Sequence, residues 1–242
     1  METKEAILKQ VAAAIEHQAG VDMQAAALDL HWQDGAVVVD GEVPDVRTKK
    51  MAVAAAEGAA AGAGVIDRMR VDSGPPLGDG ATRDAVCRWL LRDIDFQNCG
   101  IRACVKNQLE TLREPGAAAS GDIEVSVEDG VVTLTGHVIS LSHKRLAGVL
   151  AWWARGCRDV VNDLEVQPGE EDNDEEIAEA LKLVLESDPY VHADQIGVGA
   201  RDRVVTLKGQ VWSENERRRA EQDAWCIFAV QRVVNQLEVL PA

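Results

Sequence analysis

The stretch EDGVVTLTGHV, at residues 128–138, decides the fold of this chain. An Asp-Gly pair stands between two runs of alternating apolar residues, which is a strong signal for a β-hairpin with a two-residue turn. A glycine late in the second run, Gly136, is typical of a bulge or of a close approach by another backbone. The stretch therefore predicts two antiparallel strands joined by a tight turn.

The same stretch occurs three times in the chain. QDGAVVVDGEV at residues 33–43 and RDRVVTLKGQV at residues 201–211 align with it without a gap, and the register holds for nearly forty residues. Such internal repetition indicates repeated structural units. We therefore predict three domains of one fold. They cover residues 1–72, 81–167 and 173–242.

Glycine and aspartate define the repeated hairpin. The glycines of the motif are Gly35, Gly41, Gly130, Gly136 and Gly209. The third repeat has Asp202 and Arg203 where the others have Asp-Gly, so its turn must either differ or tolerate strain.

Each repeat is predicted to have the order α-β-β-α-β. Apolar residues at helical spacing open every repeat, as at Val86, Leu90 and Ile94 in the second. A second helix follows the hairpin, from about Pro44 in the first repeat and from a capping Ser140 in the second. A strand–helix–strand connection favours parallel pairing. The fold class is therefore α+β, with three tandem domains, each a three-stranded mixed sheet with two helices on one face.

The second repeat carries an insertion at about residues 98–121. Within it, residues 105–113 suggest a short helix, and residues 114–121 suggest a flexible loop. Linkers rich in Gly, Pro or acidic residues at 73–80 and 168–174 separate the repeats.

Composition excludes several classes of function. The chain has 25 Lys plus Arg against 41 Asp plus Glu, a formal net charge of −16. This argues against nucleic-acid binding, because the phosphate backbone requires a basic face. No apolar run reaches the roughly 18 residues of a transmembrane helix. Because no basic segment followed by an apolar segment opens the chain, we expect a cytoplasmic protein.

The reactive residue types form no repeated constellation. The five histidines occupy different positions of the repeat, whereas an active site duplicated with the domain would recur at aligned positions. Alternating acids at 172–176 resemble part of a calcium loop, but its glycine is missing, so an acidic linker and helix start is favoured, with Asn173 or Asp174 as the cap. We therefore predict no enzyme, no cofactor and no metal.

The five cysteines are predicted to be reduced, because their number is odd and no CxxC motif is present. Cys87, Cys157 and Cys226 are predicted to be small buried apolar residues. Cys99 and Cys104 lie in the insertion, where a redox role for the pair is one hypothesis.

The repeated motif resembles the BON domain. The resemblance rests on Asp-Gly-x-Val-x-Leu-x-Gly-x-Val at residues 129–138 and on Val-x-x-Val-x-Asn-x-Leu-x-Val at residues 230–239, and it covers nearly the whole chain. The first repeat departs from it, with Asp40 before the glycine and Asp67 in place of the terminal Asn. The resemblance implies the α-β-β-α-β fold and a non-enzymatic module associated with phospholipid membranes and osmotic stress. Some relatives are cytoplasmic, including a potassium-binding protein.

Two features are candidate contacts for a lipid or a partner. Trp152 and Trp225 align on the second helix and are predicted to pack in the core, whereas Trp153 faces elsewhere and is the better surface candidate. The only basic cluster is Arg217, Arg218 and Arg219, for which an ion-paired helix face is favoured over a phosphate or headgroup site because acids flank it.

These observations predict a stress-related binding protein that binds a phospholipid surface or a partner protein. The alternative is a cytoplasmic sensor of a small ligand or of a monovalent cation such as potassium. No nucleic-acid partner is expected, and the sequence assigns no oligomeric state.

Overall fold

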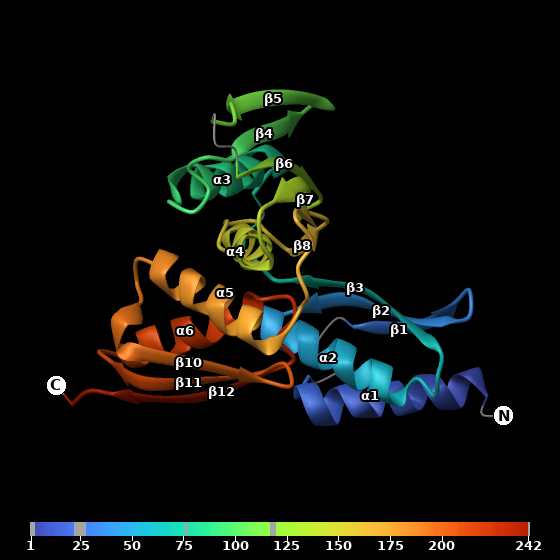
Figure 1. The fold of residues 1–242 in the computed structure, drawn as a ribbon. Helices are drawn as coiled ribbons and strands as arrows, with labels where there is room; N and C mark the ends of the chain where they lie inside the picture. The colour runs from blue at the N-terminus through green and yellow to red at the C-terminus, as the bar shows by residue number, and fades with distance from the viewer. Residues whose placement is uncertain (1–2, 22–27, 76, 117–119, 242) are drawn as a thin grey trace. The chain divides into compact units, whose positions relative to one another are not determined.

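A computed structural model describes residues 3–21, 28–75, 77–116 and 120–241 (Figure 1). The chain divides into two compact units, Met1–Ser73 and Gly74–Ala242. The first unit contains one repeat and the second contains two, so the predicted α+β architecture of three repeats is confirmed. Pro76 in the predicted linker and residues 117–119 in the predicted loop lie outside the described residues.

None of the described helices is both long enough and apolar enough to cross a lipid bilayer.

The first unit shows the repeat in its simplest form. Its elements are α1 (Lys4–Ala19), β1 (Asp29–Gln33), β2 (Ala36–Val43), α2 (Val46–Ala59) and β3 (Gly64–Val71). Strand β2 is central, antiparallel to β1 and parallel to β3. Ala52 and Ala56 on α2 are fully buried, and these small side chains one turn apart let the helix lie close to the sheet.

The third repeat has the same topology. Its elements are α5 (Asp174–Ser187), the short 3₁₀ helix η1 (Ala193–Gln195), β10 (Ile196–Arg201), β11 (Val204–Val211), α6 (Glu214–Cys226) and β12 (Arg232–Val239). Strand β11 pairs antiparallel with β10 and parallel with β12. Helices α5 and α6 cover one face of this sheet (Figure 1).

The second repeat contains the same unit with a larger sheet. Its elements are α3 (Asp79–Arg92), β4 (Gly100–Val105), β5 (Gln108–Arg113), β6 (Gly121–Glu128), β7 (Val131–Val138), α4 (Leu141–Trp152), β8 (Asp159–Asn162) and β9 (Glu165–Val166). The strand order is β5-β4-β6-β7-β8, and β9 also pairs with β7. The insertion thus adds the hairpin β4–β5 beside β6.

Two sequence-based predictions for this repeat are wrong. Residues 105–113 form no helix, because Lys106 and Asn107 both have positive φ, at 49° and 62°, and close a tight turn between β4 and β5. Ile94 does not continue the apolar face of α3, and it is 73% exposed. The helix ends at Arg92 because Asp93 is extended and its side chain accepts a hydrogen bond from the Asp95 N–H.

All three predicted hairpins have the same tight turn. Its two central residues have positive φ in every repeat, including Asp202 at 51° and Arg203 at 61°. The third turn therefore tolerates the strain of a non-glycine residue at its second position. Asp174 at the start of α5 supports this turn by accepting hydrogen bonds from both N–H groups, at 2.6 and 3.0 Å. These two hydrogen bonds hold the pKa of Asp174 below its usual range, and the bond from Arg203 has the larger effect.

The helix caps follow the sequence signals with one exception. Asn173 caps α5, which leaves Asp174 free to bind the hairpin, and Ser140 caps α4 as predicted. The prediction that Pro44 opens the first turn of α2 is wrong. Asp45 caps that helix instead, accepting a hydrogen bond from the Thr48 N–H at 2.7 Å.

A polar side chain at the same aligned position of each repeat, within or at the end of the strand that follows the second helix, ties that helix to the sheet. In the third repeat, Asn235 donates to the backbone carbonyl of Arg217 at 3.1 Å. In the first repeat the residue is Asp67, whose Oδ2 lies 3.1 Å from Nζ of the buried Lys49. Lys49 and Arg217 are aligned positions, so an ion pair replaces the amide–carbonyl hydrogen bond. This explains how the first repeat accommodates its departure from the family pattern.

We predict that Gly209→Ala destabilises the third repeat. Gly209 has a φ of 131°, and a Cβ there would lie 2.0 Å from the Gln195 carbonyl oxygen. We expect the free energy of unfolding to fall by about 2 kcal/mol or more, measured by urea denaturation.

Gly199→Ala is the matched control, because a Cβ at Gly199 has open space around it and its backbone is ordinary. Equal stabilities of the two variants would contradict the close approach at Gly209.

Candidate functional site

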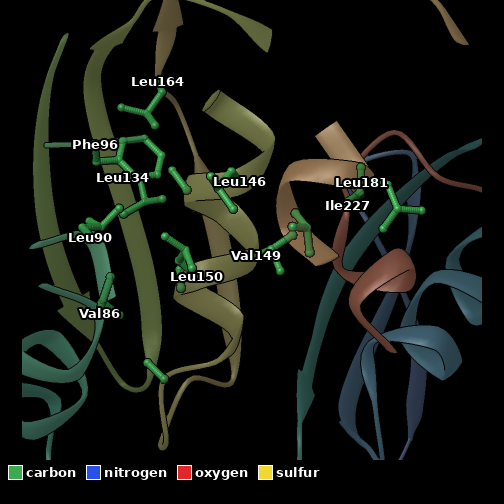
Figure 2. Packing of buried hydrophobic residues seen from close by; sticks show 14 of the residues in the cluster. Val86, Leu90, Phe96, Leu134, Leu146, Val149, Leu150, Leu164, Leu181 and Ile227 are labelled. Carbon is green, nitrogen blue, oxygen red and sulfur yellow. The ribbon is translucent and has the colours of Figure 1, made fainter. Parts of the chain in front are cut away.

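Helix α4 joins the second and third repeats into one core. It is buried almost along its whole length. Leu146 and Leu150 lie toward Leu134 of their own sheet, while Val149 lies toward Leu181 and Ile227 of the third repeat (Figure 2). The side chains of one continuous apolar cluster thus connect the two repeats, and this fixes the surroundings of the residues at the end of α4.

Trp153, directly after α4, lies at the contact between these repeats. Its indole N–H donates to Oδ1 of Asp223 at 2.8 Å. Its ring meets that of Trp89 edge to face, with centroids 5.3 Å apart, and the guanidinium of Arg219 lies 5.2 Å from its centroid. Trp153, the predicted surface candidate, is half-buried against the third repeat. Trp225, predicted to be a core residue, is 5% exposed.

Arg219 stands between two buried carboxylates. It forms an ion pair with Asp188 and lies 3.8 Å from Asp223, and both acidic side chains are almost wholly inaccessible. Burial raises the pKa of Asp223 well above its usual range; Arg219 opposes this shift and the neighbouring Asp188 adds to it. One positive charge therefore faces two acids, and folding favours a proton on Asp223.

The three arginines of α6 do not act together. Arg217 and Arg218 both pair with Glu214, at 3.2 and 3.4 Å, on the solvent side of the helix. Arg219 turns inward to Asp188. The ion-paired helix face favoured by the sequence is present, and the side chain of Arg218, at 68% exposure, is the most accessible of the three. Headgroup binding by this cluster stays a prediction.

Sequence reasoning missed two exposed aromatic residues of the third repeat. Tyr190 is 72% and Trp212 is 62% exposed. They line a groove of about 460 Å³, which we call the aromatic groove. Its remaining lining residues are His192, Ser213, Asn215, Glu216 and Arg219.

A nearly buried glutamate positions the aromatic groove. Oε1 of Glu216 accepts the backbone N–H of His192 at 2.8 Å, and Oε2 accepts that of Trp212 at 2.8 Å. Burial raises the pKa of Glu216, but these backbone hydrogen bonds outweigh it and hold the pKa below its usual range. The carboxylate is therefore charged and holds together the two segments that present the aromatic rings.

A sequence signal for Trp212 exists in hindsight. Trp212 directly precedes the cap Ser213, where an apolar residue often packs on the fourth residue of the helix, but that residue here is the polar Arg217. Ile139 occupies the aligned position of the second repeat and is also exposed, at 41%. The second and third repeats thus both present a large apolar side chain before the second helix.

The five cysteines are free thiols that are buried or half-buried. Among the described residues, no group of three His, Cys, Asp or Glu side chains is placed to hold a metal ion. Burial raises the pKa of the Cys87 thiol to about 11, so it is protonated at neutral pH. Cys99 is buried and Cys104 half-buried, and both are free thiols. The predicted redox role of this pair stays a hypothesis.

Three segments of the chain match the model of the BON domain, at residues 3–73, 100–168 and 173–241. The chain belongs to the BON-domain family. The second BON match begins after α3, where the β4–β5 hairpin separates that helix from the rest of its domain. The BON family is generally non-catalytic.

This BON-domain protein is similar to a curated relative, "Osmotically-inducible protein Y" of Escherichia coli strain K12. It is 31% identical over 125 residues, which cover 49% of this chain and 62% of the relative. The match thus spans about three fifths of the length of the relative. Among solved structures, the C-terminal domain of CdsD, a structural protein of the type III secretion system of Chlamydia trachomatis, is 14% identical with a TM-score of 0.24, covering 100% of both chains.

We predict that the acid pair beside Trp153 makes stability depend on pH. The pKa of Asp223 is higher in the folded than in the unfolded protein. Its contribution to the free energy of unfolding is therefore present below the usual carboxyl range and is lost as the pH rises through the raised pKa. Asp223→Asn keeps an oxygen for the indole N–H and removes the titration. As the pH rises above the usual carboxyl range, urea denaturation should show wild-type stability falling relative to the variant.

Asp202→Asn serves as the control, because the Asp202 side chain is 89% exposed. Parallel stability curves for wild type and Asp223→Asn would show that Asp223 does not titrate with folding.

Proposed function

We propose that this chain is a non-enzymatic protein related to osmotic stress that docks on a phospholipid surface through its third BON domain. The observation that supports the docking is the pair of exposed rings, Tyr190 and Trp212, that line the aromatic groove. The name of the Escherichia coli relative, osmotically-inducible protein Y, supports the relation to osmotic stress.

The aromatic groove has the chemistry of an interfacial site. Tryptophan and tyrosine have an apolar ring with a polar edge, which suits the boundary between lipid headgroups and acyl chains. The net charge of −16 opposes adsorption on anionic lipid, so binding must gain free energy from apolar contact.

The test is flotation of the purified chain with liposomes of neutral or anionic lipid across a salt series. We expect co-flotation that largely survives high salt, because apolar insertion is not screened. The double variant Tyr190→Ala, Trp212→Ala should reduce the bound fraction several-fold.

Leu109→Ala is the matched control, since Leu109 is an exposed apolar residue of the second BON domain, at 51% exposure. No flotation of the wild type with any lipid, or equal loss in control and double variant, would contradict the proposal. The partner-protein alternative would then apply to the aromatic groove.

A further inference from the structure

A second hollow lies in the second BON domain, on α3 and the end of α4. It has a volume of about 400 Å³, and we call it the arginine hollow. It is lined by Leu77, Ala81, Ala85, Arg88, Trp89, Arg92, Trp153 and Arg155. Three of these residues are basic and none is acidic.

The three arginines of this hollow are accessible and unpaired. Arg88 and Arg92 stand one turn apart on α3 and therefore share a face of the helix, and Arg155 follows α4. All three are exposed, and within the described parts of the chain none of them forms an ion pair.

This lack of partners distinguishes them from other arginines of the second unit. The paired arginines include Arg83 with Asp84, Arg102 with Asp122, Arg145 with Asp172, Arg217 with Glu214 and Arg219 with Asp188. In a chain with a net charge of −16, carboxylates are plentiful. Three arginines that gather around one hollow without any of them are therefore available for an external anion.

Two tryptophans form the apolar wall of the arginine hollow. Trp89 and Trp153 meet edge to face with their ring centroids 5.3 Å apart. Apolar walls exclude water from one side of a bound anion, which strengthens its interaction with nearby guanidinium groups. The planar guanidinium presents two parallel N–H donors, and this geometry matches the oxygens of a phosphate.

We propose that the arginine hollow binds a phosphate monoester group, held by Arg88, Arg92 and Arg155. This site is separate from the aromatic groove and does not depend on the docking of the third BON domain. The group can belong to a soluble phosphate compound or to the headgroup of phosphatidic acid, and the chemistry of recognition is the same.

Trp153 provides a direct readout of binding. Its side chain lines the arginine hollow. Its indole N–H donates to Asp223, and its ring contacts Arg219. A dianion in the hollow changes the electrostatic field at this ring. Indole N–H signals in a ¹⁵N-labelled full-length chain therefore report binding, and Trp153→Phe and Trp89→Phe assign the two signals.

The experiment titrates the full chain with inorganic phosphate, and then with a soluble short-chain phosphatidic acid, at constant ionic strength kept with sodium chloride. We expect saturable shifts of the Trp89 and Trp153 signals. Arg88→Ala with Arg92→Ala should weaken the apparent affinity at least about tenfold, because charge-assisted hydrogen bonds are lost. Arg201→Ala with Lys208→Ala removes the same charge from exposed positions of the third domain and should leave the affinity unchanged.

The outcomes separate the sources of the phosphate. Saturation by inorganic phosphate supports a soluble ligand, while saturation by phosphatidic acid alone supports a lipid headgroup. In both cases the affinity must fall in the Arg88, Arg92 variant. Shifts that do not saturate, or equal affinities in this variant and its control, overturn the proposal. The Tyr190, Trp212 variant should bind phosphate normally, so failure of this site and failure of docking by the third domain are distinguishable.

Discussion

The arrangement of the second unit depends on the burial of α4 on two sides. One side packs on the sheet of the second domain, and Val149 on the other side packs against the third (Figure 2). A domain of about 70 residues buries a modest apolar core when it stands alone. Sharing one helix between two domains enlarges this core without adding chain length. It also places the residue after the helix, Trp153, at a contact that neither domain forms separately.

The same positions of the repeat take different roles in neighbouring domains. Leu146 and Leu150 of α4 align with Arg219 and Asp223 of α6. In the second domain these positions pack in the core, whereas in the third they form an ion network with Asp188. Buried charges are costly unless they are paired and hydrogen-bonded. Arg219 offsets part of this cost, while Oδ2 of Asp223 is buried without a hydrogen-bond partner. The network also supplies the acceptor for the indole of Trp153, so it helps to specify how the two domains meet.

Repetition made most of the fold predictable from the sequence. Alternating residues, the turn glycines and the cap Ser140 recur in aligned registers, and the repeated core follows from them. The β4–β5 hairpin occurs once, and the sequence 105–113 has apolar residues compatible with either a short helix or a strand. Its true conformation depends on the free edge of β6, a tertiary partner that local pattern does not reveal.

The candidate sites were less predictable because they depend on which side chains lack a partner. The run from Arg217 to Arg219 is the most basic stretch of the sequence, yet in the structure each of these arginines pairs with a carboxylate. Arg155 is far along the chain from Arg88 and Arg92, and it joins them only after α3 and α4 have packed. In an acidic chain, the physical mark of an anion site is therefore an arginine without an acid, rather than a cluster of arginines. That property belongs to the packed structure, because only packing decides which acids each arginine can reach.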